Sequence, residues 1–499
     1  MVEVGGTIVT RCHGPESGDI LSRHRRHTHR SPAMSMRRLS FALPLAVLSL
    51  QAATGLVVRA GQTAPPPAAA SAARPADHVI VISIDGFRPA MYLDSEREGV
   101  TLPHLQALRA AGSSAEGMVV AHPSLTYVSH TTLATGVRPV RHGIISNTKF
   151  DPPAGSPQWY YEADALKVPA IWDRASAHHL KTAVASWPVT VGAPIDVRFP
   201  ESNQAPPDST WLARARRDST PGLVDAVAQQ LAPYGENANR DAVQRDRFTA
   251  AMAAHIIRTE RPNLLMIHLM ETDTAQHADG PGSVAARTAI QHIDAHVGAI
   301  LAAADEAGIR DRTAVIVTGD HGFSRVHTLI QPNVILRQHG WLATNERGRV
   351  ATWQVASHAS AIRLKDPGDT ALAAKVEQAF REAAAVTYKG IFRVVSRAEL
   401  DDLGAYPEAA FFIEPAEGYY VSDGVQDDSV LVGAARFGAH GFLPTEARMH
   451  TGFIAAGAGI RRGVPLPLLR QIDVAPTIAR LLGFTMPDVD GVPIVGVLK

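Results

Sequence analysis

Acidic and imidazole side chains follow three apolar runs of the sequence. Asp85 ends the run HVIVISID, Asp320 and His321 follow VIVTG, and Asp273 and His277 come shortly after LLMIHL. A buried strand is stabilised by apolar area, so ionisable groups at its end must reach solvent or meet a charge partner. Carboxylates that converge repel one another. Salt bridges, a raised pKa or a divalent cation are the alternatives that reduce this repulsion.

The mixture of Asp and His indicates which cation these groups would bind. Zinc binds both carboxylate and imidazole at about 2.0–2.2 Å, with manganese as the alternative. Asp273 and His277 are four residues apart, a spacing that places both side chains on one face of a helical turn. His440 lies between glycines in FGAHGF and is a further candidate, while the only cysteine, Cys12, lies in the predicted leader. Because an isolated Asp–His pair is usually structural, the metal hypothesis depends on the shared placement of these residues after apolar strands.

A Ser/Thr-rich stretch, HPSLTYVSHTTLATG at 122–136, supplies a candidate nucleophile. Pro123 and Ser124 are typical of a helix start, which places Thr126 in the first turn, where unpaired backbone N–H groups and the helix dipole favour an anion. Threonine is a poor nucleophile at its free pKa, but zinc at its oxygen would deprotonate it near neutral pH. The alternative is that the stretch only caps and packs a helix.

Alternating strands and helices must bring these residues together. Strands are predicted at 78–84, 182–186, 263–269 and 313–318, and helices at about 102–111, 284–304 and 472–482. This alternation favours an α/β fold with a mainly parallel sheet and helices on both faces. Ligands of such sheets collect at the carboxyl ends of the strands, which is where the candidate residues stand.

Composition divides the chain into four parts. Residues 1–75 are predicted as a leader, signal peptide and Pro/Ala-rich linker, 76–365 and 431–499 as the two parts of a catalytic core, and 366–430 as a small α+β insertion that forms one wall of a cleft. Met36-Arg37-Arg38 before the apolar run at 41–50 is typical of a secretory signal, and this run is too short to span a bilayer. We expect cleavage within about 36–60 and a periplasmic or secreted protein without a membrane span, an uncleaved anchor being the alternative.

The charge of the chain is balanced, with 48 Lys and Arg against 48 Asp and Glu in 499 residues. No net field favours nucleic acid or an anionic membrane as partner. Any anion must therefore be attracted locally, and it is the resemblance of the motifs to a known family that implies a small-molecule substrate.

The motifs, taken in order, resemble those of the nucleotide pyrophosphatase/phosphodiesterases (type I phosphodiesterases) of the alkaline phosphatase superfamily. The likeness covers about 77–365 and 431–495 and rests on VISIDGFRP, TYVSHTTLATG, RPVRHGIISN, SWP, ETDTAQH, VTGDHG, GAHGF and IDVAPTIARLLG. The resemblance implies an alkaline-phosphatase-like fold, two zinc ions per chain, and hydrolysis of phosphodiester or pyrophosphate bonds of nucleotide-type substrates through a covalent phosphothreonine.

The resemblance also implies roles for individual residues. Asn147 matches the asparagine that, with a backbone N–H, holds a phosphoryl oxygen, and Thr126 matches the nucleophile. One metal site is expected at Asp85, Thr126, Asp320 and His321, and the other at Asp273, His277 and His440.

The sequence departs from the family at two places. The family usually has Phe-Pro-Asn after the nucleophile, where this chain has Tyr127-Val128-Ser129, and its Glu-Glu-Pro-Asp is METD at 270–273. The metal ligands are retained, so we expect the changes to act on substrate preference, with Tyr127 as an aromatic wall that binds substrate. Five nearby histidines match no ligand position and are expected to pack or to support the ligands: His122, His130, His142, His268 and His450.

Other functions remain compatible with the motifs. A phosphomonoesterase or phosphonate hydrolase on the same scaffold is the enzymatic alternative, whereas a formylglycine sulfatase is disfavoured because position 126 is not cysteine. A catalytically silent periplasmic protein that keeps the metal site is the alternative from another class, and the intact set of ligands with Thr126 argues against it.

Overall fold

The structure is a computed structural model that describes residues 74–152, 158–202, 209–232, 234–236, 241–425, 428–434 and 437–499. The predicted signal peptide, and the linker up to residue 73, lie outside the described residues. Within the described ranges no helix is both long and apolar enough to cross a membrane.

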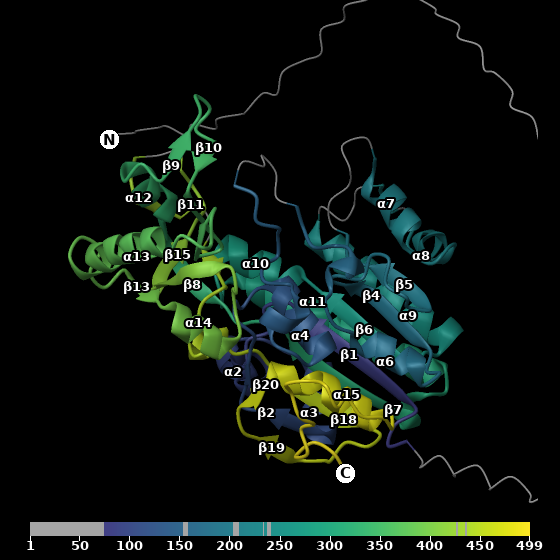
Figure 1. Cartoon of the computed structure of the whole chain (residues 1–499). Coiled ribbons are helices and arrows are strands. Elements are labelled where there is room, and N and C mark those ends of the chain that lie inside the picture. Colours follow the sequence, from purple (N-terminus) through teal and green to yellow (C-terminus); the bar gives the residue numbers. More distant parts are fainter. Residues whose placement is uncertain are drawn as a thin grey trace, which may run out of the picture. The chain divides into compact units, whose positions relative to one another are not determined.

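An eight-stranded sheet forms the centre of the fold (Figure 1). Five neighbouring strands run parallel, and β18 is antiparallel to β7. In spatial order the strands are β19 (Val464–Leu466), β2 (Ser113–Ala115), β18 (Phe453–Gly457), β7 (Thr313–Gly319), β1 (His78–Ile84), β6 (Leu264–Leu269), β4 (Thr182–Trp187) and β5 (Val197–Pro200). The predicted α/β class with a mainly parallel sheet is confirmed, and the predicted strands agree with the observed ones to within a residue.

Helices cover both faces of this sheet because its central strands are apolar on both sides. Ile80, Ile82 and Ile84 of β1 belong to one apolar cluster, whereas Val79 and Val81 belong to the other. Burying each such side chain contributes about 1.5–3 kcal/mol. The first cluster includes α3 (Pro103–Ala111), α7 (Trp211–Asp218), α8 (Leu223–Gln230), α9 (Ala242–Glu260) and α11 (Val284–Glu306), and the second α4 (Thr126–Thr135), α6 (Ile171–Ala177) and α15 (Val474–Leu481).

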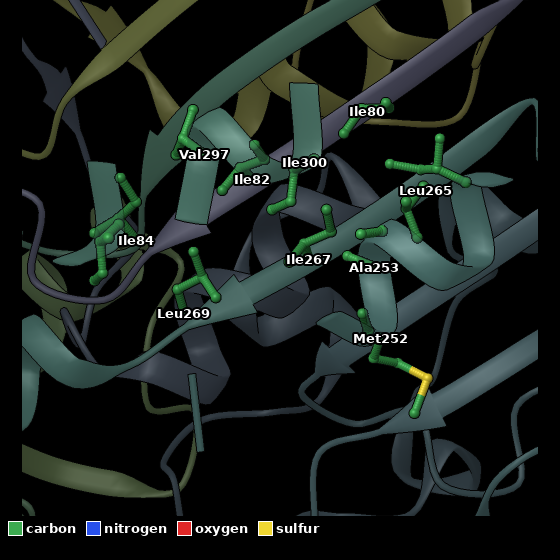
Figure 2. Packing of buried hydrophobic residues seen from close by; sticks show 14 of the residues in the cluster. Ile80, Ile82, Ile84, Met252, Ala253, Leu265, Ile267, Leu269, Val297 and Ile300 are labelled. Atoms are coloured by element: carbon green, nitrogen blue, oxygen red, sulfur yellow. The ribbon is translucent and has the colours of Figure 1, made fainter. Parts of the chain in front are cut away.

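Figure 2 shows the first of these clusters from close by. The isoleucines of β1 and the side chains of Leu265, Ile267 and Leu269 on β6 meet Met252 and Ala253 of α9 and Val297 and Ile300 of α11. This packing makes the central strands a rigid base, so the residues at their carboxyl ends are held in place.

A second, four-stranded sheet consists of β11 (Val355–His358), β12 (Ala361–Leu364), β14 (Ala409–Pro415) and β13 (Phe392–Val395). One face packs with α12 (Pro332–Gln338) and α13 (Thr370–Ala385), and the other with α14 (Arg397–Leu403). Two of its strands precede residue 366, where the predicted insertion begins. The boundaries of the insertion stay a prediction.

Smaller sheets complete the described part of the chain. The one that matters for the site joins β15 (Gly418–Val421), β8 (Ser324–Ile330), β16 (Leu431–Gly433) and β17 (Gly438–Ala439), because β8 follows His321 and β17 precedes His440. The others are β9 (Leu342–Thr344) with β10 (Val350–Trp353), and β3 (Met118–Val119) with β20 (Leu469–Arg470). Short helices are α1 (Ala90–Leu93), α2 (Ser95–Glu98) and α5 (Pro139–His142), and α10 (Glu271–Asp279) follows β6.

Candidate active site

Three neighbouring strands bring the predicted acidic residues to one edge of the central sheet. The last residue of β1, Ile84, lies opposite Leu269 of β6 and Gly319 of β7. Asp85 and Asp320, which come next in the chain, therefore lie side by side, and both are buried.

The start of α10 is fixed to this edge by two buried contacts. Asp246 of α9 accepts hydrogen bonds from the N–H groups of Met270 at 2.8 Å and Glu271 at 2.7 Å. The Thr272 hydroxyl donates to the carbonyl of Asp85 at 2.6 Å. Because α10 continues as a helix to residue 279, Asp273 and His277 share one face, as their spacing predicts. The cap by Asp246 was not predictable, because the two segments are remote in sequence.

His440 reaches the same edge through a strand pair. Gly438 and Ala439 of β17 pair with Arg325 and Ser324 of β8, just after His321. The rings of His321 and His440 stack with centroids 3.5 Å apart. A histidine more than a hundred residues away in sequence is thus brought next to the end of β7.

Helix α4 begins at Thr126, which confirms its predicted place in the first turn. The preceding residue, Leu125, offers no side-chain cap, so the first N–H groups of the helix lack that partner. Thr126 Oγ1 lies 3.4 Å from His321 Nε2. Asn147 Oδ1 accepts the N–H of Tyr127 at 2.9 Å, which places the predicted asparagine beside the nucleophile candidate.

The three predicted histidine ligands share one hydrogen-bonding arrangement. Each places Nδ1 against a backbone carbonyl, which only accepts, so Nδ1 carries the proton and Nε2 keeps its lone pair. Imidazoles that bind metals are usually fixed in this way. The acceptors are Gly438 O for His277 at 2.8 Å, Gly322 O for His321 at 3.1 Å and Ser124 O for His440 at 2.9 Å.

The Nε2 atoms of these three histidines lie close to the carboxylates. Nε2 of His277 lies 3.3 Å and Nε2 of His440 lies 3.6 Å from Asp273 Oδ1. Nε2 of His321 lies 3.1 Å from Asp320 Oδ2 and 3.3 Å from Asp85 Oδ1. All six predicted Asp and His ligands therefore converge, together with Thr126.

The carboxylates present oxygens that have no hydrogen-bond partner. Asp320 Oδ1 accepts the N–H groups of Gly86 and His321 at 3.0 and 2.9 Å, and Asp85 Oδ2 lies 3.0 Å from His268 Nε2. In contrast, Asp85 Oδ1, Asp273 Oδ1 and Asp320 Oδ2 are buried without a hydrogen bond. Leaving a charged acceptor in this state is costly, so the donor set fits a divalent cation.

The protonation preferences agree with this interpretation. Burial, and then the charges of Asp320 and Asp273, raise the pKa of Asp85, and burial also raises the pKa of Asp320. Burial lowers the pKa of His321 to about 4 and that of His440 to about 3, so both imidazoles are neutral near pH 7. Neutral imidazoles beside crowded carboxylates are the chemistry that zinc sites use.

Donor atoms form one group that lies within the predicted first site and one that combines residues of both predicted sites, because it contains His321 in place of His277. Asp85, Asp320 and His321 form one group with ligand atoms within 4.8 Å of one another, and Asp273, His321 and His440 form another. A third group of this kind, His130, His268 and Asp320, was not predicted. It offers few free atoms, because both nitrogens of His268 contact carboxylates and His130 Nδ1 contacts the Thr126 carbonyl.

Tyr127 is placed differently from the prediction. Its ring is fully buried and packs against Trp159 and Tyr161, with centroids 5.2 and 6.2 Å away, and its hydroxyl donates to Glu201 Oε1 at 2.8 Å. This corrects the expectation of an aromatic wall that binds substrate, because no part of the ring is exposed. A large ring gains free energy by burial when its hydroxyl finds a partner, and Glu201 provides that partner.

Ser124 is a supporting residue that sequence reasoning assigned only to a helix start. Its hydroxyl donates to Phe442 O at 2.9 Å and accepts the Gly441 N–H at 3.0 Å, while its carbonyl holds His440. Ser124 therefore ties the loop of the nucleophile candidate to the loop of one ligand candidate.

Residues 79–443 match the family model described as type I phosphodiesterase / nucleotide pyrophosphatase. The chain belongs to this family. The family predicted from the motifs is thereby confirmed.

Curated relatives match about half of the chain. An uncharacterized pyrophosphatase/phosphodiesterase of Schizosaccharomyces pombe is 28% identical over 247 residues, which are 49% of this chain and 44% of that protein. Human ectonucleotide pyrophosphatase/phosphodiesterase family member 1 is 26% identical over 261 residues, 49% of this chain and 23% of that protein. The chain thus spans less than half the length of these relatives.

A solved structure has the same fold. Murine ectonucleotide pyrophosphatase/phosphodiesterase 5 matches with a TM-score of 0.60 at 20% identity, covering 85% of this chain and 100% of that one. A structure of its inactive threonine-to-alanine variant, in complex with AMP, matches with a TM-score of 0.59 at 19% identity. The alkaline-phosphatase-like fold expected from the motifs agrees with this likeness.

Proposed function

We propose that the protein is a zinc-dependent hydrolase of phosphodiester or pyrophosphate bonds that forms a covalent phosphothreonine on Thr126. The observation that carries the proposal is the position of the Thr126 hydroxyl, 3.4 Å from His321 Nε2 at the start of a helix. Family membership supports the reaction class. The AMP complex of the inactive threonine variant of the murine relative supports a nucleotide-type substrate.

The candidate residues have separate roles as metal ligands and as nucleophile. Asp85, Thr126, Asp320 and His321 would hold one zinc ion, and Asp273, His277 and His440 the other. When bound, the two ions supply Lewis acidity that lowers the pKa of a hydroxyl and offsets charge on phosphoryl oxygens. Thr126 Oγ1 attacks phosphorus in line as the leaving alkoxide departs, and water then cleaves the phosphothreonine.

Asn147 and the first turn of α4 position the phosphoryl group. The Tyr127 N–H donates to Asn147 Oδ1 at 2.9 Å, and a phosphoryl oxygen placed next to Thr126 would replace Asn147 Oδ1 as its acceptor. The amide of Asn147 is a second donor at the same place, and the helix N-terminus favours the negative charge. These donors stabilise the charge that develops in the transition state.

The proposed function is tested on purified protein with its zinc content measured beside its activity. We expect two zinc ions per chain and turnover of nitrophenyl phosphodiesters that falls in proportion as a chelator removes zinc and returns when zinc is restored. Active protein in which elemental analysis finds no zinc would contradict the proposal.

The same assay distinguishes a phosphodiesterase from a phosphomonoesterase. Hydrolysis of monoesters and hydrolysis of phosphonates are the alternative activities. We expect a higher kcat/KM for bis(nitrophenyl) phosphate than for nitrophenyl phosphate at equal zinc concentration and pH. A monoester brings two charges and three free oxygens, so a site specialised for it needs cationic donors beyond the metals. A clear preference for the monoester would overturn the diesterase assignment and leave the metal sites standing.

The arginines that could supply such donors are engaged elsewhere. The three arginines of the segment 366–430 pair with carboxylates of that segment, and Arg363 before it is buried over the rings of Phe150 and Tyr406. The cluster on α7 also pairs with acids. The ion pairs are Arg381–Glu377, Arg393–Glu399, Arg397–Asp401, Arg214–Asp218, Arg216–Asp225 and Arg217–Asp218.

Export of the protein is proposed from the pattern at 36–60. The mature form would be periplasmic or secreted and would lack residues 1 to about 60. Amino-terminal sequencing of the protein recovered outside the cytoplasm is expected to start near that position, and a start at Met1 would rule the proposal out.

A further inference from the structure

Four buried polar groups form a continuous hydrogen-bonded chain behind the candidate site. The Tyr127 hydroxyl donates to Glu201 Oε1 at 2.8 Å, Glu201 Oε2 lies 2.9 Å from His268 Nδ1, and His268 Nε2 lies 3.0 Å from Asp85 Oδ2. None of the four residues is more than 3% exposed. This series of hydrogen bonds begins in the first turn of α4 with Tyr127. It continues through Glu201, the residue after β5, and His268 of β6, and ends at Asp85 after β1.

The direction of each bond follows from the groups. Both neighbours of His268 are carboxylates, which accept, so His268 donates from both of its nitrogens. Asp85 Oδ2 is thereby occupied, while Asp85 Oδ1 has no hydrogen bond and lies 3.3 Å from His321 Nε2. The carboxylate is held with one oxygen turned away from the site and the other turned into it.

Packing alone does not account for this chain of groups. Taking two carboxylates and an imidazole out of water is costly, and apolar side chains of similar volume usually stabilise such a position equally well or better. The hydrogen bond to Glu201 also requires a tyrosine at position 127. The family usually has phenylalanine at this position, which has no hydroxyl and could not donate to Glu201. The hydroxyl of Tyr127 thus has a role in the hydrogen-bonded chain, and the departure from the family pattern is explained without contact to substrate.

We propose that Glu201, His268 and Tyr127 are positioning residues for the metal site at Asp85. His268 orients Asp85 so that Oδ1 is presented to the ion, Glu201 fixes the ring of His268, and Tyr127 couples this support to the turn that carries Thr126. Groups that orient a metal ligand in this way typically change metal affinity by about 10–100-fold when they are removed. The inference rests on the proposed function only in taking Asp85 as a zinc ligand.

The test measures zinc affinity of the metal-free protein by competition with a chromophoric chelator, alongside circular dichroism. Glu201→Gln and His268→Ala are each expected to weaken one of the two zinc sites by about 10–100-fold and to leave the other unchanged. Tyr127→Phe weakens the same site by a smaller factor. His268→Gln, which keeps a donor toward Asp85, recovers part of the affinity. Tyr92→Phe is the control, because it removes another buried hydroxyl, one that donates to Ala115 O.

The outcomes separate this inference from the proposed function. Two zinc sites in the unaltered protein, with wild-type dissociation constants at both sites in Glu201→Gln and Tyr127→Phe, would overturn the inference and leave the function intact. An unaltered protein that binds no zinc would overturn both. Glu201→Gln and Tyr127→Phe are nearly isosteric, so they decide the question even where His268→Ala does not fold.

Discussion

Replacing Thr126 with alanine is expected to lower kcat for a phosphodiester by roughly 10⁴- to 10⁶-fold, the loss typical of removing a covalent nucleophile. The substitution removes the hydroxyl and the γ-methyl group from a side chain that is 8% exposed and begins α4. Alanine suits a helix, so the fold persists. Asp85, Asp320 and His321 remain to hold the neighbouring ion, so zinc content falls little.

Two further variants make the Thr126 result specific. Thr135→Ala removes a buried hydroxyl from the other end of α4, where it donates to Thr131 O and accepts the Val137 N–H, and its turnover is expected to stay near normal. Thr126→Ser keeps the hydroxyl and is expected to trap a phosphorylated serine when the reaction is quenched with acid. Near-normal turnover in Thr126→Ala, or a phosphoryl group recovered on another residue, would contradict the nucleophile assignment.

The strand ends were predictable because each apolar run stops where ionisable side chains begin. The apolar runs that precede Asp85 and Asp320 are β1 and β7 to within a residue, and the four-residue spacing of Asp273 and His277 lies on α10 as expected. Parallel pairing of neighbouring strands then requires that their ends meet. A local pattern and one rule of topology are sufficient for this part of the site.

The supporting groups were not predictable in the same way. Glu201 and His268 are 67 residues apart in sequence and Ser124 and His440 are 316 apart, and each pair is joined by a hydrogen bond that forms only in the folded chain. Neither pair produces a periodic or compositional pattern in the sequence. We expected Tyr127 to contact substrate because it follows Thr126 in the sequence. The direction of its side chain is instead set by Glu201 and by the rings around it. Side-chain direction at such a position depends on contacts that only the folded chain contains.

The boundary of the small sheet shows a second limit of local patterns. β11 and β12 are four residues each and precede residue 366, and such short segments give little periodicity. Their hairpin places Ala359 and Ser360 beside Leu125 and His440, around a small pocket. The segment before the predicted insertion therefore contributes to the surroundings of the site.

Removal of Asp273 or of His440, two of the three ligand candidates at the second metal site, is expected to lower kcat/KM by about 10²- to 10⁴-fold, since one catalytic metal supplies several kcal/mol of transition-state stabilisation. The variants are Asp273→Ala and His440→Ala. Both side chains lie at the edge of the sheet and outside the apolar clusters that hold the strands together. We therefore expect the fold to persist and the zinc content to fall from two ions to one.

The matched control for Asp273→Ala is Asp279→Ala, which removes an exposed carboxylate from the last residue of the same helix. Its activity and zinc content are expected to stay normal, so a loss confined to Asp273→Ala cannot come from α10 itself. The two ligand variants should also agree with each other, because Asp273 Oδ1 lies 3.6 Å from His440 Nε2 and the two would share one ion. If either variant kept near-normal turnover with two zinc ions bound, the second site would have to be assigned to other residues, while Thr126 and the site at Asp85 would be unaffected.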